Sequence, residues 1–257
     1  MSYLFRDTDL AAQRLRVLAN VFAESSRPFI EDVVSSASQL ALDLGCGPGY
    51  TTHLLADTTR CVQAIGIDAS EHFITLANRS ATDSITFMRH DVTQIPFPSG
   101  QSDLILCRML LTHLQDPLSV IERWTTQLRP QGLLLLEEVE SIQTEQPLFR
   151  QYLDIVAAML AYQANQLYIG PLLDQQQMRN GTRRHMSRIF HLPVSTAMAA
   201  TMFSMNIASW KNQPFIQEHY PVVMIDQLEA DLGELATTSI KTDEIEWSTR
   251  QIAYERI

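Results

Sequence analysis

The chain of 257 residues contains three cysteines, and no two of them form a CxxC pair. Cys46, Cys61 and Cys107 are an odd number at unrelated spacings, which disfavours both a disulfide framework and a structural zinc site. No apolar run approaches the roughly 18–20 residues that a membrane-spanning helix needs. The charged N-terminal segment also lacks the apolar stretch of a signal peptide. We therefore expect a cytoplasmic protein with no metal site and no membrane partner.

Basic residues are also few, because 19 lysines and arginines stand against 29 aspartates and glutamates, for a formal net charge of −10. An acidic protein repels phosphate backbones, so nucleic acid is not an expected partner unless basic residues gather locally. We interpret the densest basic group as the solvated end of a helix. Neither charge nor composition predicts the oligomeric state. The four arginines of that group are Arg179, Arg183, Arg184 and Arg188.

Short apolar runs without polar alternation recur along the first half of the chain. Runs of this length between helix-competent stretches indicate strands that are buried on both faces, as in a parallel sheet. Asp116-Pro117 has the pattern of a helix start, and residues 129–132, Arg-Pro-Gln-Gly, are expected to break that helix before the next strand. The alternation predicts a doubly wound, Rossmann-like α/β fold. The runs are residues 40–44, 62–67, 85–88, 104–107 and 133–136.

Helical patterns also lie before and after this alternation. Residues 8–30 have Leu15, Leu18 and Phe22 on one helical face, and a later helix is expected to begin near Gln146. Two further strands, at 186–194 and 250–257, would complete a mostly parallel sheet of seven strands. The predicted organisation is an N-terminal helical cap at 1–35 and a main domain at 36–257, with helical lid segments at about 145–182 and 195–238.

Glycine is scarce as well, yet three of the nine glycines lie in ALDLGCGPGY, directly after the first strand. Gly45, Gly47 and Gly49 are therefore at the carboxyl end of a strand, where doubly wound sheets bind ligands. A ligand that approaches the backbone closely would exclude side chains there. The alternative is a tight loop with positive φ, which we expect to explain one or two of these glycines. We predict a binding site at this turn.

Two acids follow at the ends of the next two strands. Asp68, in IGIDAS, comes about 20 residues after the glycines, where an acid accepts hydrogen bonds from the ribose hydroxyls of an adenosine. Asp91, in FMRHDV, can accept a hydrogen bond from an adenine amino group, and the Val92 amide can donate to a ring nitrogen. The spacing G-x-G-x-G differs from the dinucleotide fingerprint G-x-G-x-x-G. An adenosyl ligand is favoured, with a nicotinamide oxidoreductase as an open alternative.

These residues resemble the class I S-adenosylmethionine-dependent methyltransferase family. ALDLGCGPGY is similar to its first motif, IGIDAS to its ribose-binding acid and HDVTQIPF to its adenine-binding loop. SDLILCRMLLTHLQDP and LRPQGLLLLEE resemble its fourth and fifth strand segments, although Gln131 departs from the usual Pro-Gly-Gly turn. The resemblance covers about residues 38–140, and more loosely the whole chain resembles a bacterial small-molecule branch. It implies S-adenosylmethionine as cofactor, S-adenosylhomocysteine as product and a small organic acceptor.

The resemblance also implies a role for individual residues at the ends of the first four strands. The glycines would leave room for the amino acid and ribose parts of the cofactor. Asp43 would order the turn and approach the methionine ammonium, and Cys107 with Arg108 would face the methionine part and the substrate pocket. The implied cofactor-binding residues are Asp43, Gly45, Gly47, Gly49, Asp68, Ala69, Asp91, Val92, Cys107 and Arg108.

His113 and Arg108 are the candidate catalytic residues. Methyl transfer from a sulfonium is an in-line displacement, so holding the acceptor in line and dry is the main task. A base helps only where the acceptor must lose a proton. His113 is the leading base, but a structural hydrogen bond to the backbone or to Asp116 is an open alternative, and Glu137 and Glu138 offer carboxylates nearby. The alternative function is the same fold with other chemistry, or a binding module.

Overall fold

A computed structural model describes residues 7–178, 181–237 and 245–257. Within them the strands form one sheet of order β3-β2-β1-β4-β5-β7-β6. Strand β7 is antiparallel to both of its neighbours, and the other pairings are parallel. The predicted mostly parallel seven-stranded sheet is confirmed. Its strands are β1 (Leu40–Leu44), β2 (Gln63–Asp68), β3 (Ile85–Arg89), β4 (Ser102–Arg108), β5 (Leu128–Thr144), β6 (Thr182–Val194) and β7 (Ile245–Arg256).

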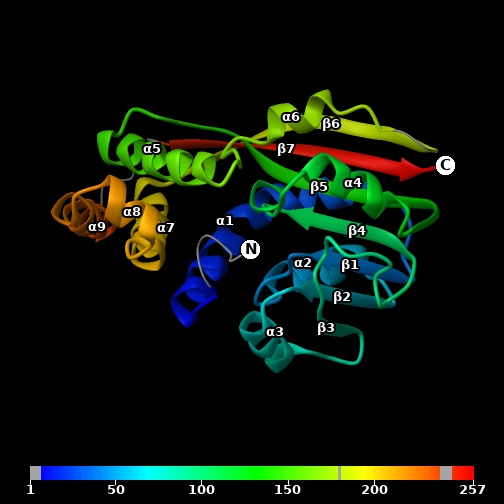
Figure 1. Cartoon of the computed structure of the whole chain (residues 1–257). Coiled ribbons are helices and arrows are strands. Elements are labelled where there is room, and N and C mark those ends of the chain that lie inside the picture. The colour runs from blue at the N-terminus through cyan, green and yellow to red at the C-terminus, as the bar shows by residue number, and fades with distance from the viewer. Residues whose placement is uncertain (1–6, 179–180, 238–244) are drawn as a thin grey trace.

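The helices fall into two groups joined by the long strands β5 and β7. Figure 1 shows α5, α7, α8 and α9 together at one end of the molecule, away from the short parallel strands, with α1 between the two groups. No described helix is both long and apolar enough to span a membrane. The helices are α1 (Asp9–Val33), α2 (Tyr50–Thr59), α3 (Glu71–Ala77), α4 (Pro117–Thr125), α5 (Pro147–Tyr162), α6 (Gly170–Gln175), α7 (Thr196–Trp210), α8 (Pro214–His219) and α9 (Val222–Thr237).

Strand β1 is buried along its whole length because helices pack on both faces of the sheet. Ala41 packs on one face with Phe29 of α1 and Leu55 of α2. Leu42 packs on the other face in a cluster that includes Trp124 of α4. This double coverage explains why the run at 40–44 has no polar alternation.

Strand β5 corrects one prediction. Residues 129–132 were expected to form a loop between a helix and a strand, but they are part of β5 itself. Helix α4 has already ended at Thr125. The register between β4 and β5 shifts between Ser102 and Leu104, and Gln131 has a φ of 65°. The Pro-Gln-Gly segment is therefore an irregularity inside β5. The strand continues past it although the segment has more residues than the facing part of β4.

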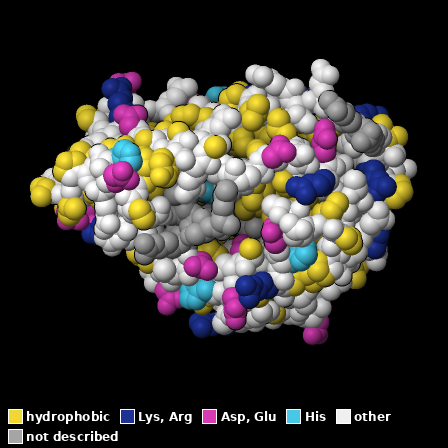
Figure 2. Space-filling view, viewed as in Figure 1, with side chains coloured by type: hydrophobic (Ala, Val, Ile, Leu, Met, Phe, Trp, Pro, Cys, Tyr) yellow, Lys and Arg dark blue, Asp and Glu magenta, His cyan; other side chains and the backbone are white. Residues whose placement is uncertain are grey.

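The predicted helix end at the arginine group is also wrong. Arg183, Arg184 and Arg188 lie on β6, whereas Arg179 lies outside the described residues. Each of the three forms an ion pair with a carboxylate, so their charge is neutralised locally. Figure 2 shows the Lys and Arg side chains of one face scattered rather than gathered in a stripe. The carboxylate partners are Glu255 for Arg183, Asp174 for Arg184 and Asp32 for Arg188.

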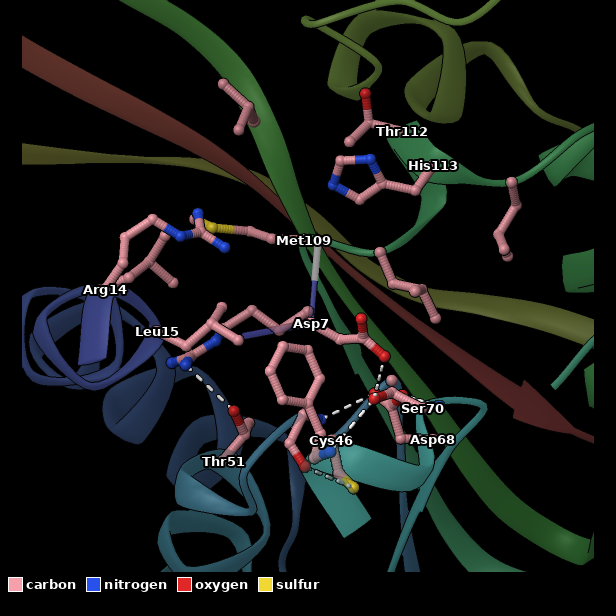
Figure 3. A pocket seen from close by; sticks show the side chains of 18 of the residues that line it. Asp7, Arg14, Leu15, Cys46, Thr51, Asp68, Ser70, Met109, Thr112 and His113 are labelled. Atoms are coloured by element: carbon pink, nitrogen blue, oxygen red, sulfur yellow. Dashed lines mark hydrogen bonds between the residues drawn. The ribbon is translucent and has the colours of Figure 1, made fainter. Parts of the chain in front are cut away.

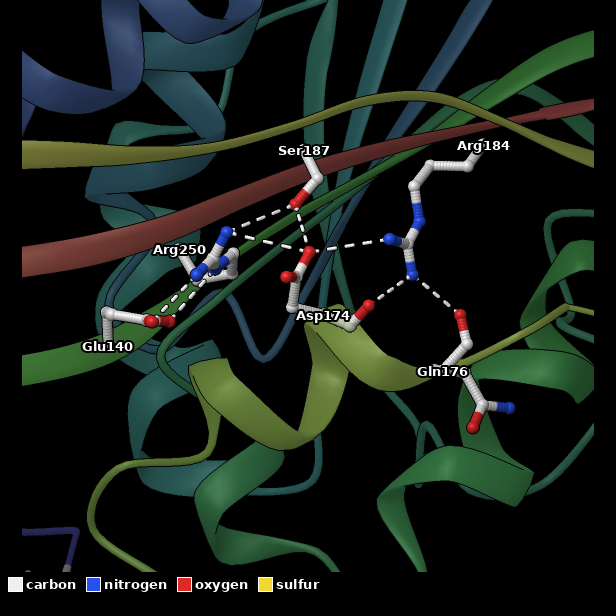
Figure 4. Close-up of polar contacts among 6 residues, drawn as sticks. All are labelled: Glu140, Asp174, Gln176, Arg184, Ser187 and Arg250. Atoms are coloured by element: carbon white, nitrogen blue, oxygen red, sulfur yellow. Dashed lines mark hydrogen bonds and ion pairs between the residues drawn. The ribbon is translucent and has the colours of Figure 1, made fainter.

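Helix α6 is tied to the antiparallel part of the sheet by a polar network (Figure 4). Arg250 of β7 donates to both carboxylate oxygens of Glu140, at 2.9 and 2.7 Å, and lies 3.5 Å from Asp174 of α6. The hydroxyl of Ser187 donates to Asp174 at 2.6 Å. Gly170 begins the helix, and a Cβ there would collide with Glu140. The network thus fixes the segment after α5 against the sheet.

Candidate functional site

A cavity of about 1070 Å³ is lined by the carboxyl ends of β1, β2 and β4, by α1, and by helices α5 and α7. It exceeds the roughly 300–1,000 Å³ typical of a pocket for one ligand. We call the part lined by residues 45–48, 68–70 and 91–94 the polar end. The apolar end is lined by aliphatic side chains together with Tyr152, Phe203, Asn206 and Trp247. The cavity is therefore large for a single-ligand pocket, and its two ends have different linings.

The glycine turn forms one wall of the polar end. Gly45, Gly47 and Gly49 have φ values of 72°, 53° and 91°, so positive φ accounts for all three glycines and not only for one or two. A Cβ on Gly45 would lie 2.8 Å from Leu110, and one on Gly49 would lie 2.7 Å from Phe87. Of the three, Gly45 and Gly47 line the cavity. The case for a ligand therefore rests on the place of the turn, not on its glycine count.

Asp68 holds this turn in place at the end of β2. Its two carboxylate oxygens accept hydrogen bonds from the amides of Gly47, at 2.9 Å, and Ser70, at 2.8 Å. Burial raises the pKa of Asp68, while the Ser70 and Gly47 amides oppose the rise. Figure 3 shows Asp7 beside this group, where it accepts a hydrogen bond from the Ser70 hydroxyl at 2.8 Å. Asp68 lines the cavity, and a carboxylate has lone pairs for further donors.

Ala69, Asp91 and Val92 line the same end of the cavity. Asp91 is exposed, and one of its oxygens accepts hydrogen bonds from the amide and the hydroxyl of Thr93, at 2.9 and 2.8 Å. The Val92 carbonyl accepts a hydrogen bond from the Trp124 indole at 2.7 Å. Both contacts fix the loop after β3 in one conformation beside the glycine turn.

Asp43, Gly49 and Cys107 are not among the described residues that line the cavity. Asp43 is buried, accepts a hydrogen bond from the Thr52 hydroxyl at 2.7 Å, and has a pKa raised by burial to about 6. This hydrogen bond ties β1 to the start of α2. Cys107 packs in the core, and its sulfur lies 4.0 Å from Glu138. Its predicted contact with the pocket is not found.

Arg108 lines the cavity and joins it to a buried polar network. Its guanidinium donates to the hydroxyls of Ser26 in α1 and Thr51 in α2, both at 3.0 Å. Ser26 in turn donates to Glu137, which also accepts from Gln251 at 2.7 Å. Burial lowers the pKa of Arg108, and the nearby Glu137 opposes that change. Sequence patterns did not indicate this network, because its members come from α1, α2, β4, β5 and β7.

His113 lines the cavity beside Thr112, outside both of the ends defined above (Figure 3). We call its position the junction. Burial, with a smaller contribution from Arg14, lowers its pKa to about 3. The imidazole is therefore neutral at physiological pH. Arg14 of α1 also lines the cavity and was not predicted, although the helical pattern at 8–30 had placed Leu15 and Leu18 on one face.

Glu138 anchors the loop that carries His113. One of its carboxylate oxygens accepts hydrogen bonds from the amides of Leu110 and Leu111, both at 2.8 Å. The side chain is fully buried, and burial raises its pKa to about 8. Glu137 and Glu138 were expected to offer carboxylates to the pocket, but neither is among the described lining residues. Glu138 instead binds the Leu110 and Leu111 amides, and Glu137 accepts from Ser26 and Gln251.

The apolar end is built by residues that lie far apart in the sequence. Tyr152 of α5 and Phe203 of α7 stack with ring centroids 4.0 Å apart, and the Trp247 ring of β7 lies 6.1 Å from Phe203. Asn206 donates to the Tyr152 hydroxyl at 2.6 Å. The aliphatic lining residues are Leu18, Val139, Ile142, Leu153, Val156, Leu160 and Leu167.

Comparison with known proteins gives a domain assignment. A family described as a methyltransferase domain matches residues 42–136. Over these residues the chain is similar to methyltransferases. A ubiquinone biosynthesis O-methyltransferase from Marinobacter nauticus is 31% identical over 117 residues, which are 43% of this chain and 48% of that protein. Phosphoethanolamine N-methyltransferase 3 from Arabidopsis thaliana is 29% identical over 134 residues, 51% of this chain and 27% of that protein.

The chain spans about half of the length of these relatives or less. A solved structure of coclaurine N-methyltransferase, bound to N-methylheliamine and SAH, matches with a TM-score of 0.55 at 14% identity, over 91% of this chain and 72% of that one. This likeness shows a shared fold. The matched segment 42–136 begins in β1 and ends within β5, so it includes the polar end but neither α1 nor the helices of the apolar end.

Proposed function

We propose that the chain transfers a methyl group from S-adenosylmethionine to an oxygen, carbon or nitrogen atom of a small organic molecule. The observation that carries this proposal is the continuity of the cavity, which joins the Asp68 turn to an apolar chamber. A sulfonium cofactor at the polar end would present its methyl group to an acceptor in that chamber. In-line displacement needs this arrangement of two bound molecules with little water between them.

We assign the polar end to the adenosyl part of the cofactor. The Asp68 carboxylate would accept hydrogen bonds from the ribose hydroxyls beside Ala69. Asp91 and the Val92 amide would bind the adenine edge. The methionine part would then lie along the turn, toward the guanidinium of Arg108. Asp43, Gly49 and Cys107 would support the site indirectly, and Gly45 and Gly47 would leave space for the cofactor.

The chain's contribution to the transfer would be positioning rather than proton abstraction. S-Adenosylmethionine supplies an activated methyl group when it is bound. The apolar end would exclude water from the acceptor, and the neutral His113 would orient a polar group of the acceptor at the junction. An imidazole whose pKa is lowered to about 3 is a weak base at neutral pH, since efficient proton transfer needs a pKa near the working pH.

Calorimetry with S-adenosylhomocysteine and with NAD tests the cofactor assignment. We expect binding of S-adenosylhomocysteine and none of NAD, and the reverse result would favour a nicotinamide oxidoreductase. Transfer of a labelled methyl group from S-adenosylmethionine to a pool of small organic molecules tests the reaction. Binding of the cofactor without a labelled product would instead support the alternative, an enzyme of the same fold with other chemistry or a binding module.

The cavity also supports proposals about the binding partner and the domain organisation of the chain. We propose a small molecule, and neither nucleic acid nor a membrane, as the partner of a cytoplasmic protein, because the cavity is walled by helices and the chain is acidic. We also propose that residues 1–35 act as a cap, with lid segments at about 145–182 and 195–238. Chromatography with and without S-adenosylhomocysteine would measure the oligomeric state.

A further inference from the structure

Helix α1 contributes two neighbouring serines to the buried polar network around Glu137. The hydroxyl of Ser25 donates to one carboxylate oxygen of Glu137, and the hydroxyl of Ser26 donates to the other. Both serines and the glutamate are fully buried, so water does not compete for these contacts. Gln251 donates to the oxygen that Ser25 binds, at 2.7 Å. Two of the three donors to this carboxylate thus come from a helix outside the matched segment 42–136.

Ser26 differs from Ser25 because its hydroxyl oxygen also accepts a hydrogen bond from Arg108. The Nη1 atom of Arg108 donates to that oxygen at 3.0 Å. The Ser26 hydroxyl therefore joins a cation to an anion, since it accepts from one and donates to the other. The Nη2 atom of Arg108 donates at 3.0 Å to Thr51, which lines the cavity (Figure 3). These two contacts fix the orientation of the planar guanidinium.

The guanidinium of Arg108 also has an N–H group that a ligand can reach. A guanidinium carries five N–H donors, and the described hydrogen bonds of Arg108 use two of them. Its Nε atom has no partner among the described residues, yet it is not one of their fully buried nitrogen atoms without a partner, so it keeps accessible surface. Because Arg108 is only 8% exposed and lines the cavity, that surface is open to a ligand there.

A carboxylate is the ligand group that fits Arg108. The planar fork of a guanidinium matches a carboxylate, and such pairs are among the strongest hydrogen bonds in proteins. S-Adenosylmethionine has one carboxylate, in its methionine part. The described acidic lining residues, Asp7, Asp68 and Asp91, lie at or beside the polar end and would repel that group. The carboxylate would therefore be directed away from the adenosyl end and toward Arg108.

We propose that Ser26 is a positioning residue, which holds the guanidinium of Arg108 apart from Glu137 so that Arg108 can bind the carboxylate of the cofactor. This inference rests on the proposed function. Without the Ser26 oxygen, the Arg108 cation and the Glu137 carboxylate each lose a partner, and they would pair directly. Direct pairing would turn the guanidinium away from the cavity. Helix α1 thus controls cofactor affinity, although Ser26 itself is not among the described lining residues.

Calorimetry of the full chain tests the carboxylate contact with two probes, S-adenosylhomocysteine and S-adenosyl-3-thiopropylamine, which is the same molecule without its carboxylate. The unmodified chain should bind S-adenosylhomocysteine at least about tenfold more tightly, the scale of hydrogen bonds to a charged group. Arg108→Met should abolish this preference without weakening the binding of the amine. Equal binding of the two probes by the unmodified chain would overturn the proposal. So would a full preference in Arg108→Met, which would assign the carboxylate to another lining cation such as Arg14.

Two serine variants separate positioning from general support of the network. Ser26→Ala and Ser25→Ala are matched, because each removes one buried hydroxyl that donates to Glu137. Ser26→Ala should reduce the preference for S-adenosylhomocysteine over the amine by at least about threefold and leave the affinity for the amine unchanged. Ser25→Ala should keep the full preference, since its described partners are Glu137, Thr249 and Gln251. An equal change in both variants, or none in Ser26→Ala, would contradict the assignment.

Binding of S-adenosylhomocysteine by the unmodified chain is measured first, and this separates the two proposals. No binding of either probe would refute the proposed function. Binding of both probes with equal affinity would refute the positioning role alone.

Discussion

The two ends of the cavity are built in different ways. At the polar end, backbone conformation sets the geometry, with three glycines at positive φ and two backbone amides bound to Asp68. At the apolar end, side chains from α5, α7 and β7 set it by packing against each other. The matched domain, 42–136, contains the first end and stops before the helices of the second. Under the proposed function, backbone geometry would bind the cofactor, whereas packed side chains would contact the acceptor.

A change at the glycine turn should have the largest effect. Gly49→Ala places a Cβ 2.7 Å from the Phe87 ring on a residue with φ of 91°. Strain and overpacking together should lower the free energy of unfolding by about 3 kcal/mol, measured by urea denaturation. Gly100→Ala is the control, because Gly100 has φ of 76° but open space around it, and it should cost only about 1 kcal/mol. Equal losses would show that packing is irrelevant there.

Removal of the Asp68 carboxylate should weaken cofactor binding at the polar end of the cavity without changing the apolar end. Asp68→Ala should reduce the affinity for S-adenosylhomocysteine by about 1–3 kcal/mol, the range for hydrogen bonds to a charged group. Calorimetry measures this, and Asp83→Ala, at an exposed position outside the cavity lining, is the control. Unchanged affinity in a folded Asp68→Ala protein would remove this residue from the site.

The free energy of unfolding should depend on pH because of Glu138, which holds the loop at the junction between the two ends. Burial raises the pKa of this group from 4.5 to about 8, so the folded state binds its proton more tightly than the unfolded state does. The free energy of unfolding should therefore fall as the pH rises between these two values. Glu138→Gln cannot lose a proton and should gain stability relative to the original chain, by about 3 kcal/mol from pH 5 to pH 8.

Denaturation of both proteins across that range measures the difference. Asp43 and His113 also have shifted pKa values, but they are present in both chains and their contributions cancel. A difference that does not change with pH would mean that Glu138 is ionised in the folded state, or that its pKa is not raised.

A change at the apolar end should have the smallest effect on stability and almost none on the cofactor. Phe203→Leu loses the stack on Tyr152 and should cost about 1 kcal/mol of unfolding free energy, the scale of one aromatic pair. Its affinity for S-adenosylhomocysteine should stay within about twofold, which is below 0.5 kcal/mol. An affinity loss as large as that of Asp68→Ala would show that the two ends are not independent.

The sequence predicted the parallel core and the polar end because both depend on contiguous residues. The run at 40–44 became β1, and Asp68 does lie beside the glycine turn. Arg14 was missed because nothing in the pattern of an amphipathic helix distinguishes an arginine that lines a cavity from one in solvent. Residues 129–132 were misplaced because proline and glycine are typical both of loops and of strand irregularities. The roles of the predicted site residues remain proposals.

The sequence by itself determined the alternation of strands and helices, the glycine turn and the position of the acids that follow it. Such features need only neighbours along the chain and the direction of parallel strands. Folding in three dimensions decided which groups are buried, and burial lowers the pKa of His113 and raises that of Glu138. It also brought side chains of α5, α7 and β7 to the lining of one cavity. Burial and long-range contacts depend on how α1, α5, α7 and β7 pack together, and no local pattern encodes that packing.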